Sequence, residues 1–173
     1  RARSARFELT VGLQPAEAFA FFSDVARLNE VTPPWFHLDA AGGPPSRVEA
    51  GTRIDYRFTW RRLPMRWRSH ITVWEPPSYF VYEQERGPYR LFRHEHRFEP
   101  VPGGTRVIDV VHFRTAFGPL IDRWLVEPDL ERVFAFRRDY AERRFPTVVR
   151  DERPEVALTA AATGPTLRAR TVE

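Results

Sequence analysis

The sequence predicts an α+β domain in which an antiparallel sheet is followed by one long helix. Between Thr52 and Phe113, apolar and polar residues alternate with a period of two, which is typical of half-buried strands. Short turns with Pro or Gly separate these runs, so neighbouring strands are expected to be antiparallel. After Pro119 the period becomes helical. Together the patterns predict a sheet of about six to seven strands and a C-terminal helix.

The N-terminal part predicts one strand and two short helices. Residues 6–13 alternate as a half-buried strand does. Pro15 suits the first turn of a helix, and residues 16–31 predict two short helices with a break near Ser23. Residues 31–45 are rich in Pro and Gly and predict a loop.

The central part predicts the rest of the sheet. The first two strands after Thr52 place on one face Ile54, Tyr56, Phe58 and Trp60, and then Trp67, Ser69, Ile71 and Val73. Pro76-Pro77 ends the second of these strands, and Tyr79 to Glu83 predicts another. Gly87-Pro88 turns the chain into a strand that carries two histidines. The last strand runs from Thr105 to Phe113.

The strand with two histidines has an unusual inner face. Side chains two apart on a strand share a side, so Phe92, His94, His96 and Phe98 lie together. The opposite face has the solvent pattern of Leu91, Arg93, Glu95 and Arg97. A close-packed core has little use for histidine, whereas a ligand cavity or a metal site does.

The C-terminal part predicts a helix and then a tail. Helical spacing continues to Phe145, with acidic residues early and Arg143-Arg144 late, as the helix dipole prefers. Pro128 must kink this helix or begin a new segment at its first turn. Residues 150–173 are low in bulky apolar side chains and predict a disordered tail. We therefore expect one domain over residues 1–149.

Composition excludes several function classes. The chain has 173 residues and a formal charge of +4, and all 27 basic residues are arginine, interspersed with 23 acidic ones. Because no basic face stands out, we expect no nucleic-acid partner. The absence of cysteine excludes disulfides, thiolate catalysis and Cys-ligated zinc. No long apolar run or signal-peptide pattern is present, which predicts a cytoplasmic protein.

Local sequence adds a family resemblance over residues 6–146. The segments that carry it are Pro15-Ala16-Glu17 with Phe21 and Phe22, Leu28-Asn29, Thr32-Pro33-Pro34-Trp35, Gly51-Thr52, Trp74-Glu75-Pro76-Pro77, Phe80, Gln84, Gly87-Pro88-Tyr89, His94, His96 and Phe98. Together they resemble the START-like, or SRPBCC, superfamily, which includes polyketide cyclase/dehydrase-like, lipid-transport-like and bacterial ligand-binding proteins.

The resemblance implies a helix-grip fold, in which a curved antiparallel sheet wraps around the last helix. It also implies a cavity between sheet and helix for a lipid, quinone, polyketide or other apolar molecule. It implies no universal set of catalytic residues, and we expect no cofactor.

Three interpretations of His94 and His96 remain open. As metal ligands they resemble the HxH pattern of cupins, but a third ligand is missing unless His112 provides it. As acid–base groups they would move a proton on a bound substrate, with Asp109 orienting one imidazole. As polar wall residues they would hydrogen-bond to each other, to Asp109 or to water and orient a ligand. We expect no metal.

The candidate ligand-binding residues share the inner face of the predicted sheet and the last helix. They are Tyr56, Phe58, Trp67, Ser69, Ile71, Tyr82, Gln84, Phe92, His94, His96, Phe98, Asp109, Val111 and Phe134. A longer turn before the histidine strand would instead place Val81 and Glu83 inside. Trp124 and Arg137 are further candidates for a roof, with packing and solvation as their respective alternatives. The segment Thr32–His37 is a candidate lid.

Three functional hypotheses follow. The first is a carrier or sensor that binds a small hydrophobic molecule without cofactor or catalysis. The second is an enzyme of the cyclase/dehydratase type, with His94, His96 and Asp109 as catalytic candidates. The third is an interaction module that touches a membrane surface or a protein partner transiently through Trp35, Phe36 and scattered arginines.

Overall fold

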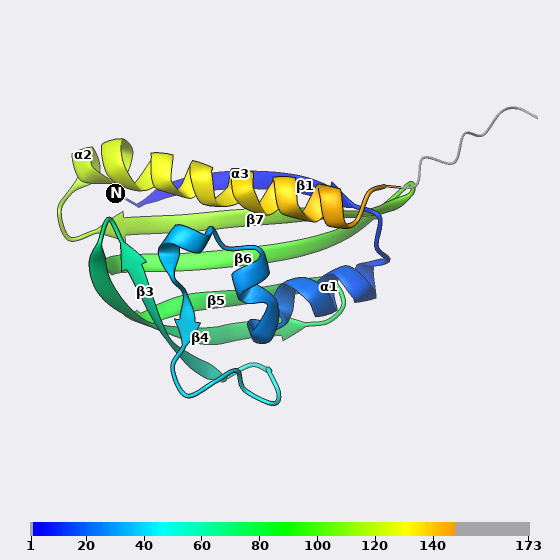
Figure 1. Ribbon diagram of the computed structural model, residues 1–173, viewed down its shortest axis with the longest axis horizontal. Coiled ribbons are helices and arrows are strands. Elements are labelled where there is room, and N and C mark those ends of the chain that lie inside the picture. The colour runs from blue at the N-terminus through cyan, green and yellow to red at the C-terminus, as the bar shows by residue number, and fades with distance from the viewer. Residues whose placement is uncertain (1, 148–173) are drawn as a thin grey trace, which may run out of the picture.

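The computed structural model describes residues 2–147, which form one antiparallel sheet with helices on its inner side (Figure 1). The strands are β1 (Arg3–Val11), β2 (Asp39–Ala40), β3 (Arg53–Trp60), β4 (Leu63–Glu75), β5 (Tyr79–Arg86), β6 (Tyr89–Val101) and β7 (Gly104–Thr115). The helical segments are α1 (Pro15–Ser23), the 3-10 helices η1 (Val25–Glu30) and η2 (Pro34–Phe36), α2 (Pro119–Ile121), the π-helical turn η3 (Asp122–Val126) and α3 (Glu127–Arg144).

The strand order is β1-β7-β6-β5-β4-β3-β2, so six strands form a meander and β1 joins its far edge. All neighbouring strands are antiparallel. Register irregularities in the β4–β5 pair, at Arg68/Ser69 and at Ile71/Val73, bend the sheet as β-bulges do. In Figure 1, α3 runs along β1 and β7, and α1 contacts β6 and β7 from the same side. This is the predicted α+β arrangement.

The pairing of β5 with β6 decides the register that the sequence left open. Tyr82 pairs with His94 and Phe80 pairs with His96, so Tyr82 faces the same side as the histidines. The alternative with Val81 and Glu83 inside is therefore wrong. The turn is held by the Gln84 side chain, whose Nε2 donates to the Tyr89 carbonyl at 2.7 Å.

The helices begin and end near the predicted positions, and two features are additional: η2 with β2 in the expected loop, and the π-helical turn η3 before α3. The predicted break at Ser23 is confirmed, because Asp24 caps η1 through a 2.9 Å hydrogen bond from Ala26 N–H. The expected loop over residues 31–45 also contains η2 and the short strand β2, which pairs with the free edge of β3. Pro128 lies in the first turn of α3, where its missing N–H leaves no hydrogen bond unmade, and the wide turn η3 precedes it.

Two apolar clusters form the core. The first surrounds α1 and contains Leu9, Val11, Ala18, Phe19, Phe21, Phe22, Val31, Phe80, Phe98, Val107 and Ala141. The second lies toward the start of α3 and contains Phe92, Val111, Phe113, Val126 and Phe134. Phe134 stacks on Phe7 with ring centroids 4.0 Å apart, which joins α3 to β1. The two clusters fix the ends of α3 and leave a polar region between them.

A tight backbone seam joins the end of α3 to the sheet. The Gly12 N–H donates to the Phe145 carbonyl at 2.8 Å. A Cβ atom on Gly12 would overlap the Pro146 carbonyl oxygen, and one on Gly104 would overlap the Val11 carbonyl oxygen. Both positions therefore require glycine for close backbone approach.

The predicted tail, residues 150–173, lies outside the described residues. Both the tail and the boundary of the domain at residue 149 stay predictions.

We expect Gly104→Ala to lower the free energy of unfolding by about 3 kcal/mol, because the added methyl group has a backbone oxygen in its place. Gly43→Ala is the control: its Cβ would meet open space, and only its positive φ should cost about 1 kcal/mol. Urea denaturation of both variants measures the difference. Equal losses would show that the seam tolerates a side chain.

Candidate functional site

Four buried polar side chains meet on the inner face of the sheet. His94 and His96 come from β6, Asp109 from β7 and Arg137 from α3, and their exposed fractions are 2%, 4%, 1% and 7%. Strand alternation explains the first three, because His96 and Asp109 are direct partners in the β6–β7 pair and His94 is two residues away. Arg137 follows the buried Phe134 by three residues on α3, so it lies on the same helix face and reaches Asp109.

Hydrogen bonds define the state of His94. Its Nε2 lies 2.9 Å from Asp109 Oδ1, and its Nδ1 lies 2.9 Å from the Tyr82 hydroxyl. A carboxylate only accepts hydrogen bonds, so we assign the proton to Nε2 and let Nδ1 accept from Tyr82. Both ring nitrogens then have a hydrogen-bond partner, and His94 links Tyr82 to Asp109.

His96 and Arg137 contact the same carboxylate less completely. His96 Nδ1 lies 2.7 Å from Asp109 Oδ1, but off the direction of a regular hydrogen bond, so we describe it as a close polar contact. Arg137 Nη1 lies 3.6 Å from that oxygen, which makes an ion pair beyond hydrogen-bond distance. One carboxylate oxygen is thus the common neighbour of three side chains.

The protonation states follow from burial and from these contacts. Burial, with repulsion from His96, lowers the pKa of His94 to about 3, although Asp109 acts in the opposite sense. Burial likewise lowers the pKa of His96. Burial alone would raise the pKa of Asp109, but the two histidines outweigh it and hold that pKa well below the ordinary value. At neutral pH the site therefore holds two neutral imidazoles, one carboxylate and one guanidinium.

A cavity of about 250 Å³ lies beside this cluster, between the sheet and α3. The candidate residues that line it are Tyr56, Phe58, Trp67, Ser69, Ile71, Tyr82, Phe92 and His96. Members of both core clusters reach its wall, so the cavity lies where the two clusters meet. Its lining is mainly aromatic and aliphatic, which is usual for small-molecule sites.

Six candidate residues do not reach the cavity. His94 and Asp109 lie behind His96, and the Gln84 amide holds the β5–β6 turn. Phe98 packs against Phe19 under α1. The two that fill the second core cluster instead are Val111 and Phe134. They share the inner face with the lining residues, but that face continues past the cavity into close-packed core.

Several lining residues were outside the candidate set. From α3 the cavity is lined by Leu130 and Val133, and from the sheet also by Ile54, Trp60, Met65, Trp74 and Phe80. Arg137, which was a candidate for the roof, lines the cavity as well. Strand alternation with Tyr56 and Phe58 was a sufficient signal for Ile54 and Trp60. Trp124 was expected to roof the cavity or to pack, yet it is 68% exposed because the π-helical turn η3 directs it to solvent.

The candidate lid lies against the cavity. Thr32 and Phe36 line it, and the ring of Phe36 lies 6.1 Å from that of Phe58. Trp35 is 55% exposed and meets Phe136 edge-on. No helix within residues 2–147 is long and apolar enough to cross a bilayer. Opening of the lid and membrane contact both stay predictions.

Three clustered side chains also bear on the metal interpretation. His94, His96 and Asp109 offer one ligand atom each within 4.8 Å of one another. These atoms contact each other directly, however, and Arg137 adds a positive charge beside them, so the cluster suits internal hydrogen bonding better than a cation. His112 does not complete the set, because it lies on the outer face of the sheet.

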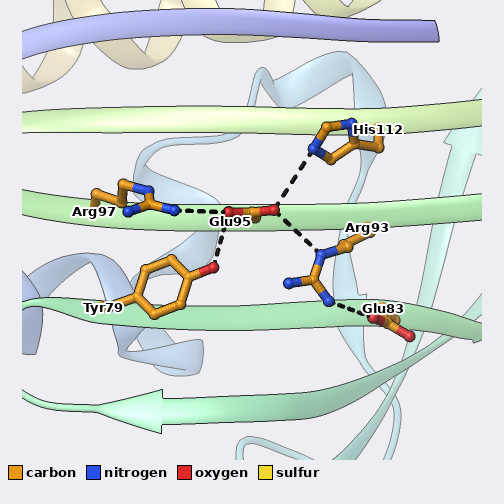
Figure 2. A network of polar contacts seen from close by, with 6 residues as sticks. All are labelled: Tyr79, Glu83, Arg93, Glu95, Arg97 and His112. Carbon is orange, nitrogen blue, oxygen red and sulfur yellow. Dashed lines mark hydrogen bonds and ion pairs between the residues drawn. The ribbon is translucent and has the colours of Figure 1, made fainter.

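Figure 2 shows the network on that outer face, centred on Glu95. Glu95 accepts from the Tyr79 hydroxyl at 2.8 Å and from Arg93 Nε at 3.2 Å, and it lies 3.5 Å from His112 Nε2. Arg93 also donates to Glu83 at 2.7 Å. Burial would raise the pKa of Glu95, but these donors hold it below its ordinary value. The network links side chains of β5, β6 and β7 on the solvent-facing side of the sheet.

Comparison with known proteins identifies the family of the chain. The sequence profile of the family described as "Polyketide cyclase / dehydrase and lipid transport" matches residues 11–137. The chain belongs to this family. The resemblance to SRPBCC proteins is therefore confirmed, and the family and fold support a ligand-binding or polyketide-cyclase-like protein.

Solved structures share the fold across nearly their whole length. The ZhuI aromatase/cyclase from Streptomyces sp. R1128 is 16% identical, with a TM-score of 0.65 over 83% of this chain and 96% of its own. Ara h 8.0201 is 17% identical, with a TM-score of 0.61 over 82% of this chain and 98% of its own. TTHA0849 from Thermus thermophilus is 16% identical, with a TM-score of 0.60 over 82% of this chain and 99% of its own.

These likenesses confirm the helix-grip fold of this family member. No curated protein matches the chain significantly.

Stability should fall as pH falls through the range in which unfolded histidine titrates. An unfolded histidine takes up a proton near pH 6.5, whereas folded His94 resists protonation to about pH 3, so the unfolded state binds more protons. We expect a loss of about 1 kcal/mol per pH unit per buried histidine between about pH 6.5 and 5. His94→Gln should flatten this slope in urea denaturation.

His112→Gln is the comparison for this experiment, because it removes a histidine from the outer face and leaves the buried cluster intact. Equal slopes in wild type and His94→Gln would contradict the assignment of His94 as a buried neutral imidazole.

Proposed function

We propose that the protein binds a small hydrophobic molecule, as a carrier or sensor, in the cavity between the sheet and α3. The observation that carries the proposal is the cavity itself. It has about 250 Å³ of space, an aromatic and aliphatic wall and several polar side chains within that wall, among them Tyr82, His96 and Arg137. Such a combination gives an apolar body a place to bind and a polar group a place to be oriented.

The size of the cavity limits the ligand. Its volume is that of about eight waters and lies slightly below the range of about 300–1,000 Å³ for drug-sized ligands. A short chain or a small ring system fits this space better than a two-chain lipid does.

Filling the cavity from α3 tests the proposal. Val133 lines the cavity, so Val133→Trp should reduce the affinity for a neutral apolar probe such as decanol at least about ten-fold by occupying its space. Ala135→Trp adds the same side chain on an exposed position of the same helix and should leave affinity unchanged. Isothermal titration calorimetry measures both, with thermal melting as a check of folding.

Failure of decanol and of other small apolar probes to bind the wild-type protein would reject the proposal. Native mass spectrometry of the purified protein gives an independent measurement, since a carrier is expected to retain ligand.

A second candidate function is catalysis of the cyclase/dehydratase type. It is favoured by His96, which lines the cavity while its Nδ1 contacts a buried carboxylate, as a base oriented by an acid does. In a dehydration, His96 Nε2 would take a proton from the carbon beside a carbonyl. The electron pair would form the C=C bond, and the β-hydroxyl would leave as water with a returned proton. Asp109 would position His96, and His94 would position Asp109.

An aromatic β-hydroxy ketone tests this candidate through the absorbance of its enone product. His96→Gln should lower turnover about a hundred-fold or more without a matching change in KM. His70→Gln, outside the cavity lining, is the control. Turnover that survives His96→Gln would remove catalysis by this residue from consideration.

A further inference from the structure

One part of the cavity wall offers one hydrogen-bond acceptor and a set of unused donors. His96 presents Nδ1 to the Asp109 carboxylate, which only accepts, so Nδ1 carries the proton and Nε2 keeps a lone pair. Within residues 2–147, Nε2 of His96 is in no side-chain hydrogen bond and, unlike Nδ1, is not among the fully buried atoms without a partner. His96 lines the cavity, and its acceptor is therefore available to a ligand.

Arg137 supplies the donors. Its side chain is buried and lines the cavity, with its guanidinium carbon 4.9 Å from the centre of the Phe134 ring. Its Nε–H has no acceptor within the described residues, and the nearest carboxylate, Asp109, is 3.6 Å away. A buried donor without a partner costs free energy, so an arginine held in this way is suited to an oxygen atom of a ligand.

Acceptor and donors belong to two side chains that share a neighbour. His96 and Arg137 both contact the same oxygen of Asp109, at 2.7 Å and 3.6 Å. The charges of Arg137 and Asp109 cancel, and Tyr82, His94 and His96 are neutral at neutral pH. The site is therefore electrically balanced before a ligand enters, which favours a head group that brings no net charge of its own or brings a proton with it.

We propose that this part of the cavity is a subsite for a carboxylic acid and that the ligand is a small apolar acid. The acid C=O accepts from the guanidinium of Arg137, and the acid O–H faces Nε2 of His96. The inference rests on the proposed binding function and names its ligand class. A ketone matches only Arg137, and a hydrocarbon matches neither group.

The same arrangement tolerates transfer of the acid proton. If it passes to His96, the resulting carboxylate lies between an imidazolium and a guanidinium, and the net charge of the site is unchanged. Arginine binds carboxylates with its planar pair of N–H donors, and such charge-assisted bonds are among the stronger ones in proteins. The aromatic part of the wall, from Phe58 to Trp67, then receives the apolar body.

The first test uses the wild-type protein and three probes of equal chain length, namely decanoic acid, decanol and methyl octyl ketone. Titration calorimetry at neutral pH gives their affinities, and the fluorescence of Trp60, Trp67 and Trp74 in the cavity wall gives a second measurement. We expect the acid to bind about ten- to a hundred-fold more tightly than either neutral probe. A purely apolar cavity gives the reverse order, because an ionised acid loses hydration on entry.

The second test replaces the donor. Arg137→Gln should remove the preference for decanoic acid over decanol. Arg138→Gln is the matched control, since it is the same change one residue along α3 on an exposed side chain. Thermal melting shows whether the variant still folds, and the probe series in the wild-type protein decides the matter if Arg137→Gln does not fold.

The outcomes separate the two proposals. Decanol or the ketone binding as tightly as the acid overturns the acid subsite and leaves the binding function in place. An acid preference that survives Arg137→Gln also overturns the subsite. If no probe binds, the proposed binding function itself is wrong.

Discussion

The buried carboxylate of Asp109 is the interaction on which the organisation of the site depends. It lies on β7, its oxygen contacts two histidines of β6, and the same oxygen faces Arg137 of α3. An isolated charge at this depth would cost several kcal/mol, so its partners have to stay close whenever the protein is folded. The pair of strands and the long helix are thus held in one relative position by a polar contact inside an apolar domain.

The cavity follows from this constraint together with the two apolar clusters. Rings pack closely around α1 at one end and around Phe134 at the other. Between them the wall carries imidazole, phenol and guanidinium groups, which are held by polar contacts with His94 and Asp109. The description of the matching family names both polyketide cyclases and lipid transport.

Much of the fold and part of the site were predictable, because the alternation of residues along a strand shows from local sequence which side chains share a face. Alternation placed His94 and His96 on the inner face, and pairing then brought Asp109 beside His96. Alternation does not say where an inner face changes from cavity to packed core, which is why Phe98 was assigned to the wrong one. The role of Arg137 depends on the rotation of α3 over the sheet, and Trp124 on the π-helical turn before it; neither is encoded in the spacing of nearby residues.

The glycine seam at the end of α3 has a consequence for how this cavity can be remodelled. Gly12 lies directly against the backbone that follows the helix, and Gly104 against Gly12 and Val11, so backbone packs on backbone there with no side chain to shorten. To accept a larger ligand, the cavity has to be enlarged by shortening side chains such as Trp67 or Ile71, and not by moving the backbone at the end of α3. In this fold, ligand selectivity is therefore open to engineering by replacing aromatic residues of β3 and β4 with smaller ones, while the C-terminal end of the helix keeps its position.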